Sequence, residues 1–249
     1  MYFPPTFGSP RRDLTLMYPD DCIQSLLIPS PWWIEDKGKE VKRGSLLRAY
    51  VPHVQQIPYV LTSVGRADPV SHGEAHIKIE PLRVKQPQKQ LGLPVAALPC
   101  YDGEVRCVYR TKRRPLLVVS TGGDEIEKAL TRGKPGWQTS PTVLAAPFYG
   151  RDEGEGRAGF SQEFVDRIRK CEYPHYLWDK LPISGASESI LRLDHIQPIG
   201  RHHDTFELLG FTLSEDAQIV LDEWLHWIVF GIFDMNGVLA ETRKALLTT

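Results

Sequence analysis

Arg192 and Asp194 are the residues of this sequence whose types and spacing are best suited to chemistry. They belong to residues 191–195 (LRLDH), whose apolar pattern predicts a strand. Successive side chains of a strand point to opposite faces, so Arg192 and Asp194 are expected on one face, about 7 Å apart. His195 is then expected with the leucines, in the core or at a dimer edge. An acid and a base at this separation can address two oxygens of one phosphodiester.

Cleavage of RNA without a metal ion needs three kinds of group around the phosphate. A base takes the proton of the 2′-hydroxyl, a donor stabilises the leaving 5′ oxygen, and cations hold the negative charge that accumulates. We assign these roles to Asp194, Arg192 and Arg114, in that order. The alternative interpretation is a solvated ion pair on the surface of the strand, which contributes little to stability.

A second feature is a local excess of positive charge in residues 106–114. Five of these nine residues are cations: Arg106, Arg110, Lys112, Arg113 and Arg114. Tyr101 and Tyr109 lie nearby in the sequence. Cations follow a phosphate backbone and aromatic rings stack on bases, so we expect Arg110, Lys112 and Arg113 to bind RNA. The alternative is an ordinary exposed end of a hairpin.

The apolar pattern predicts an α+β fold made mainly of strands. Strands are expected at residues 44–51, 75–80, 115–119, 142–148 and 189–196, and the third of them should be buried on both faces. Helices are expected at residues 124–130, 161–170 and 214–230, the last two capped by Ser161 and Ser214, and a further short helix in the tail. Pro147 should lie near the end of its strand, because a central strand cannot spare an amide hydrogen.

Composition favours a globular cytoplasmic protein, and we expect no metal or other cofactor. Hydrophobic residues make up 41% of the 249 residues, charged residues make up 24%, and the net charge of −1 argues against capture of nucleic acid by the whole chain. The four cysteines contain no C-x-x-C pair, which favours reduced thiols. No signal-peptide segment is recognised, and the longest apolar run, residues 227–233, is too short to cross a membrane. Residues 72–76 (HGEAH) and 202–204 (HHD) do not have the order of a zinc motif.

The order of the segments resembles the MazF/PemK/Kid family of toxin endoribonucleases. That family opens with Arg-Gly-Asp and an apolar strand, continues with Arg-Pro and an apolar strand ending in Ser, and then has a strand ending in Pro-x-Thr. A strand with Asp-Gln follows, and an amphipathic helix after Leu-Ser closes the pattern. The matching segments here are residues 43–47 (RGSLL), 114–120 (RPLLVVS), 145–149 (AAPFY), 193–197 (LDHIQ) and 213–214 (LS).

The resemblance implies a small SH3-like barrel of the PemK type with a long C-terminal amphipathic helix. It also implies a homodimer that cleaves single-stranded RNA to a 2′,3′-cyclic phosphate and that has an antitoxin protein as a partner. In the Kid-like branch an Arg-x-Asp on this strand supplies acid and base, which matches Arg192 and Asp194. The phosphate-handling arginine before Pro is matched by Arg114. Tyr149 stands where the family has a catalytic Thr or Ser, and we assign it to RNA binding.

The segments also suggest how the chain is organised. Residues 1–40 are expected to form an arm that packs on the core through Trp32 and Trp33. The barrel is expected at residues 41–233, with insertions at about 53–112 and 150–188, followed by a tail at 234–249. The insertions and the tyrosine at 149 leave open a non-catalytic module on the same barrel that binds nucleic acid or protein. A toxin-like module that acts on a protein target is a third hypothesis.

Overall fold

A computed structural model describes most of the chain and divides it into two compact units. The described residues are 18–27, 29–71, 73–85, 103–123, 126–139, 142–151, 159–184, 188–202 and 204–248. The first unit comprises Met1–Ala49 and Arg114–Thr249, and the second comprises Tyr50–Arg113. The fold is α+β and mainly antiparallel, as the sequence predicts.

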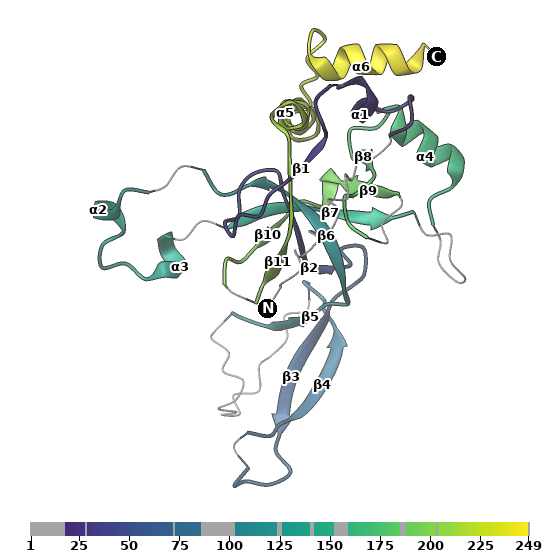
Figure 1. Ribbon diagram of the computed structural model, residues 1–249. Coiled ribbons are helices and arrows are strands. Elements are labelled where there is room, and N and C mark those ends of the chain that lie inside the picture. The colour runs from purple at the N-terminus through teal and green to yellow at the C-terminus, as the bar shows by residue number, and fades with distance from the viewer. Residues whose placement is uncertain are drawn as a thin grey trace, which may run out of the picture. The chain divides into compact units, whose positions relative to one another are not determined.

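The first unit is built on one curved sheet that forms a half-barrel (Figure 1). Its strands are β1 (Trp33–Glu35), β2 (Ser45–Pro52), β6 (Thr111–Ser120), β7 (Val143–Gly150), β8 (Tyr176–Asp179), β9 (Ser189–Arg192), β10 (Gln197–Ile199) and β11 (Phe206–Leu213). They are ordered β1-β11-β2-β6-β7-β9-β8, and β10 also pairs with β7. The pairs β1–β11, β11–β2, β6–β7, β7–β9, β7–β10 and β8–β9 are antiparallel.

The centre of this sheet is buried on both of its faces. Leu116 and Val118 of β6 are fully buried, and Leu117 and Val119 on the opposite face are 2% and 5% exposed. The prediction of a strand buried on both sides is therefore confirmed. Branched aliphatic residues suit such a strand, because they fill both faces of the pleated surface.

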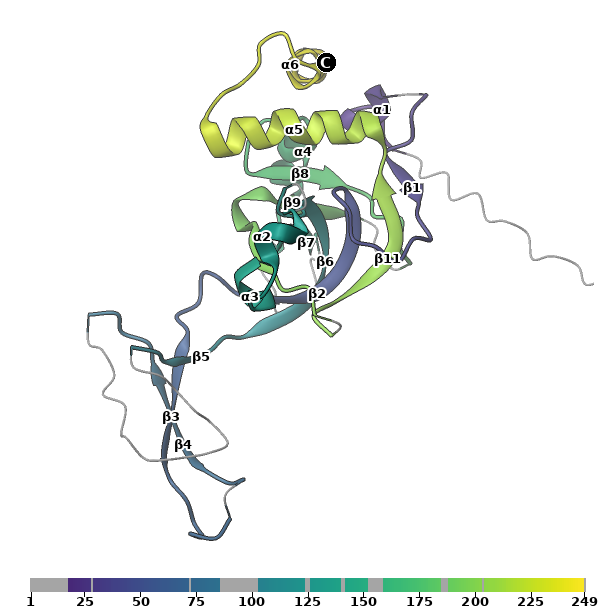
Figure 2. The same cartoon turned by 90° about the vertical axis from the view of Figure 1, so that its left-hand side faces the viewer.

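Helices of different lengths accompany these strands. They are α1 (Ile23–Leu26), α2 (Lys128–Thr131), α3 (Gly136–Thr139), α4 (Gln162–Arg169), α5 (Glu215–Phe230) and α6 (Val238–Leu247). Not all of them pack on the core, since α2 has no buried residue. The Ser161 and Ser214 hydroxyls accept hydrogen bonds from the amides of Phe164 and Ala217, so both predicted N-caps are confirmed. Gly231 ends α5 in the left-handed region, with a φ of 67°. Figure 2 shows α5 crossing over β8 and α6 on the far side of α5.

The predicted strand 189–196 is wrong in its second half. The strand β9 ends at Arg192, and Leu193–His195 form a single turn of 3-10 helix, η1. Pairing shows the cause. Leu191 pairs with Phe148 and Gln197 pairs with Ala145, so the five residues between them on this side face only two residues of β7. The turn absorbs the excess, and it begins after the position that would face Pro147.

Pro147 therefore lies inside β7, not near its end as predicted. On its β6 side it pairs with Leu116. On the other side it falls between Ala145, the last partner of β10, and Phe148, the first partner of β9. A residue without an amide hydrogen is tolerated here because the ladder on this side is interrupted at this point.

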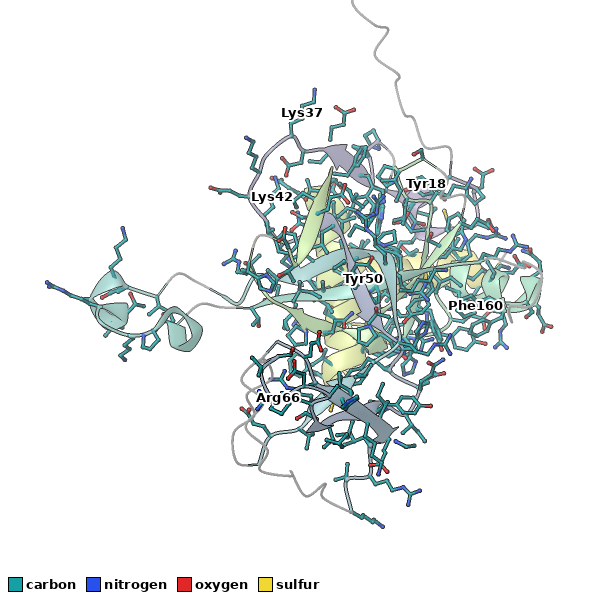
Figure 3. The ribbon with its side chains drawn as sticks, turned by 90° about the horizontal axis from the view of Figure 1, so that it is seen from below. Tyr18, Lys37, Lys42, Tyr50, Arg66 and Phe160 are labelled. Carbon is teal, nitrogen blue, oxygen red and sulfur yellow. The ribbon has the colours of Figure 1, made fainter. Side chains whose placement is uncertain are left out.

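A buried carboxylate connects the N-terminal segment to the sheet of the first unit. Asp179 of β8 is fully buried and accepts hydrogen bonds from Tyr18 Oη at 3.0 Å, Trp33 Nε1 at 2.9 Å and Trp32 Nε1 at 3.2 Å. Figure 3 labels Tyr18. Burial raises the pKa of Asp179 to about 7, and the hydrogen bonds from the two indoles and the phenol oppose this rise.

The second unit is a small antiparallel sheet with a basic composition. Its strands β3 (Tyr59–Gly65), β4 (His76–Pro81) and β5 (Arg106–Val108) are ordered β4-β3-β5. The strand predicted at 75–80 is thus confirmed as β4. Residues 50–113 contain nine Lys and Arg against five Asp and Glu, although the whole chain has a net charge of −1.

Candidate functional site

Five side chains from three neighbouring strands and the turn η1 meet in the first unit, and we call them the site cluster. Arg114 comes from β6, Tyr149 from β7, Arg192 from the end of β9, and Asp194 and His195 from η1. The sheet order β6-β7-β9 brings them together (Figure 1). The structure thereby collects all three predicted catalytic residues and one predicted RNA-binding residue in one place.

Arg192 and Asp194 form a bidentate ion pair. Arg192 Nε donates to Asp194 Oδ1 at 2.7 Å, and Nη2 donates to Oδ2 at 2.6 Å. The two side chains are 12% and 26% exposed. Burial opposes ionisation of Asp194, but the hydrogen bonds and charge of Arg192 outweigh it and hold the pKa of that carboxyl below its usual range. The carboxylate is therefore ionised over the whole physiological range.

His195 lies in the site cluster and not among the leucines, because the turn η1 replaces the predicted strand alternation. Its Nδ1 is 2.8 Å from Tyr149 Oη, and its Nε2 accepts a hydrogen bond from Arg192 Nη2 at 2.9 Å. Burial lowers the pKa of His195, and the nearby charge of Arg192 lowers it further. The imidazole is therefore neutral at pH 7. The sequence signal that could have found this residue is Pro147, which marks the position where the strand pairing fails.

Tyr149 lies close to two positively charged groups. The Arg114 guanidinium carbon lies 4.0 Å from the centre of the Tyr149 ring, and that of Arg192 lies 5.8 Å from it. At such distances a cation is attracted to the face of an aromatic ring. Burial raises the pKa of Tyr149, although the charges of Arg114 and Arg192 oppose the rise. The hydroxyl therefore keeps its proton at neutral pH.

An aromatic row continues from the site cluster along β8 and α4. Arg192 lies over Tyr176 at 4.8 Å, and Tyr176 contacts Tyr173 and Phe164 at ring separations of 6.0 and 5.4 Å. Phe160, labelled in Figure 3, stacks on Phe164 at 5.8 Å. Sequence reasoning missed this row, because its members are brought together by the pairing of β8 with β9 and by the packing of α4 on β8.

The predicted RNA-binding cations Arg110, Lys112 and Arg113 belong to the second unit. All three are exposed, and the Arg110 carbonyl accepts a hydrogen bond from the His53 amide. Tyr109 is 47% exposed, and Tyr101 lies outside the described residues. The three cations thus lie on the solvent-exposed surface of the second unit.

In the described part of the chain, no group of three or more His, Cys, Asp and Glu side chains has an arrangement that could hold a metal ion. His72 and His203, from the two histidine segments noted in the sequence, lie outside the described residues. Over the same described ranges, none of the helices is both long enough and apolar enough to span a bilayer.

The site cluster combines two guanidinium groups, one carboxylate, one neutral imidazole and one protonated phenol. Such a set can hold an anion, accept a proton and donate one, as phosphoryl chemistry without a metal requires. Comparisons with protein-family models, with curated proteins and with solved structures give no match for this chain. The function must therefore be inferred from the geometry of the cluster.

Proposed function

We propose that the site cluster cleaves single-stranded RNA without a metal ion and that the chain is an endoribonuclease of the toxin type. The observation that carries the proposal is the convergence of Arg114, Arg192 and Asp194, which the sequence separates by up to 80 residues, around one tyrosine and one neutral histidine. The half-barrel with its C-terminal helix is compatible with an enlarged SH3-like barrel of the PemK type. A homodimer and an antitoxin partner belong to the same proposal.

The proposed reaction is an attack within the RNA chain. The 2′ oxygen forms a bond to phosphorus while the bond from phosphorus to the 5′ oxygen breaks. Asp194 takes the proton of the 2′-hydroxyl, and an acid of the site cluster gives a proton to the leaving oxygen, which yields a 2′,3′-cyclic phosphate and a 5′-hydroxyl. Arg114 and Arg192 bind the phosphate oxygens, whose negative charge increases in the transition state.

The closed ion pair is the resting form of this site. A phosphate offers Arg192 an anionic partner that competes with the Asp194 carboxylate. When the Arg192 guanidinium binds a phosphate in place of Asp194, the carboxylate loses the hydrogen bonds that hold its pKa low. Asp194 then becomes a stronger base. Substrate binding would thus activate the base, which explains how a carboxylate with a lowered pKa can serve in general-base catalysis.

One observation favours the second candidate, a non-catalytic module that binds nucleic acid. Arg192 and Asp194 satisfy each other with two short hydrogen bonds, and Arg192 is only 12% exposed. A pair of this kind can be structural alone. This candidate predicts retention of RNA that weakens with salt, without cleavage.

The experiment is digestion of an RNA of mixed sequence in the presence of EDTA. We expect the wild type to produce 2′,3′-cyclic phosphate ends, and Asp194→Asn to be slower by a factor on the order of 10² to 10⁴. Glu40→Gln, which removes an exposed carboxylate elsewhere in the first unit, is the matched control and should cleave normally. An inert wild type, or an equally active Asp194→Asn, would exclude the nuclease. RNA retained but uncut would support the binding module.

A further inference from the structure

The hydrogen-bond chain through His195 determines which atoms carry hydrogens. Arg192 Nη2 lies 2.9 Å from His195 Nε2, and His195 Nδ1 lies 2.8 Å from Tyr149 Oη. A guanidinium group has donors only, so Nε2 must offer a lone pair. A neutral imidazole has one N–H, which is therefore on Nδ1.

The tautomer of His195 fixes the role of the tyrosine hydroxyl. Because Nδ1 donates, Tyr149 Oη accepts, and the hydroxyl hydrogen points elsewhere. Among the described residues, the Tyr149 hydroxyl forms its hydrogen bond with His195. The phenol hydrogen is thus left for a ligand, at a half-buried position beside two guanidinium groups.

The charged surroundings of His195 favour the neutral ring that this chain requires. Arg192 and Arg114 both oppose protonation of His195, and Asp194 Oδ2, at 3.8 Å from Nε2, is the group that favours it. Asp194 is already occupied by the two hydrogen bonds from Arg192. A proton on Nε2 would also face the Arg192 N–H, so the geometry itself opposes the charged form.

We propose that Tyr149 is a catalytic proton donor and that His195 is the residue that positions it. This inference rests on the proposed function. As the bond from phosphorus to the 5′ oxygen breaks, the Tyr149 O–H bond breaks and its proton joins the leaving oxygen. The resulting tyrosinate accepts the Nδ1–H of His195 and lies beside Arg114. After product release it regains a proton from water, and Asp194 releases to water the proton that it took from the 2′-hydroxyl.

Tyrosine suits this step better than arginine does. An arginine side chain does not lose its proton in a protein, so Arg192 can donate a hydrogen bond to the leaving oxygen but cannot protonate it. A leaving alkoxide is far more basic than a phenolate. Transfer from Tyr149 is therefore favourable even though burial raises the pKa of this tyrosine.

The first test concerns the tautomer and needs no RNA. The full chain is labelled with ¹⁵N in its histidines, and the His195 signals are identified by their loss in His195→Gln. At pH 7 we expect a protonated Nδ1 and an unprotonated Nε2. A protonated Nε2 would overturn the inference, whether or not the chain cleaves RNA.

The second test separates proton donation from binding. Tyr149→Phe keeps the ring under Arg114 and should slow cleavage of ordinary RNA on the order of 10²-fold or more. An RNA whose leaving oxygen is replaced by sulfur needs no proton donor, so Tyr149→Phe should cleave it at nearly the wild-type rate, whereas Asp194→Asn should not. A Tyr149→Phe variant that is unaffected on ordinary RNA, or is slowed equally on both substrates, overturns this inference alone. A wild type that cleaves neither substrate overturns the proposed function as well.

Discussion

Arg192 holds both carboxylate oxygens of Asp194 and, through the same Nη2 atom, also donates to His195. One guanidinium group thus controls the charge of a carboxylate and the tautomer of an imidazole. This arrangement links the ion pair, the histidine and Tyr149 into one hydrogen-bonded unit, and it makes the properties of each residue depend on the others.

The ion pair should stabilise the fold except in acid. A lowered pKa in the folded state stabilises the protein above the pKa of the unfolded chain, and the contribution is lost as the pH falls through the lowered value. We expect Asp194→Asn to lower the free energy of unfolding by about 1 kcal/mol at pH 7, because the pair is partly exposed to solvent. Denaturant titrations at pH 7 and pH 3 measure this effect. If Asp194→Asn lowers the free energy of unfolding by the same amount at pH 7 and at pH 3, the ion pair is not the source of the stabilisation.

Asp179 should give the opposite dependence on pH. Its folded pKa of about 7 lies above its ordinary value of 3.8, so its contribution is most favourable below that ordinary value and is lost as the pH rises through 7. Between pH 3.8 and pH 7, the free energy of unfolding should therefore fall by up to about 1.4 kcal/mol per pH unit. Asp179→Asn should remove the dependence, because an amide can replace the neutral acid between Tyr18 and the two indoles. Thermal melts from pH 4 to pH 8 measure it, and an unchanged slope in the variant would count against the buried neutral acid.

Arg114 should contribute to RNA affinity through its charge. Arg114→Gln removes one phosphate contact, so the slope of log affinity against log salt should fall by roughly 0.7 for single-stranded RNA. Fluorescence anisotropy at several salt concentrations measures this slope. Lys37→Gln removes an equal charge from the turn between β1 and β2, where Figure 3 shows Lys37 pointing outward, and should leave the slope unchanged. Equal slopes for both variants would show that Arg114 does not contact a phosphate of the RNA.

The cations of the second unit should affect binding rather than chemistry. Replacing Arg110, Lys112 and Arg113 together by Gln should reduce the salt slope by about 2. The cleavage rate at saturating RNA should remain within a factor of about three, since the chemical groups are assigned to the site cluster. Single-turnover kinetics measures that rate. A variant that binds normally would show that these three residues form an ordinary exposed surface.

The parts of the fold that the sequence predicted correctly are those specified by local signals. The branched aliphatic run at Leu116–Val119 predicted a strand buried on both faces, and Ser214 predicted the start of α5. Capping and hydrophobic pattern act over a few residues, so one sequence is enough to recognise them.

The parts that the sequence missed depend on pairing between distant strands. Strand alternation placed His195 with the leucines, in the core or at a dimer edge. The turn at Leu193–His195, however, follows from the mismatch between β9, β10 and their shared partner β7. The aromatic row likewise depends on how α4 packs on β8. Neither the turn at Leu193–His195 nor the aromatic row can be recognised from the residues that are adjacent to it in the sequence.

The second unit leaves the sheet and returns to it through two adjacent strands. β2 and β6 are neighbours, and the Gly44 amide bonds to the Val118 carbonyl while the His53 amide bonds to the Arg110 carbonyl, which is the pattern of a hairpin. The whole of residues 53–110 therefore occupies the place of a hairpin loop. A two-residue turn of the Asn-Gly kind could replace it and leave the central strands in register. A shortened protein of this design would keep the site cluster on about three-quarters of the present chain length. It would allow the chemistry of the site cluster to be measured without the basic second unit.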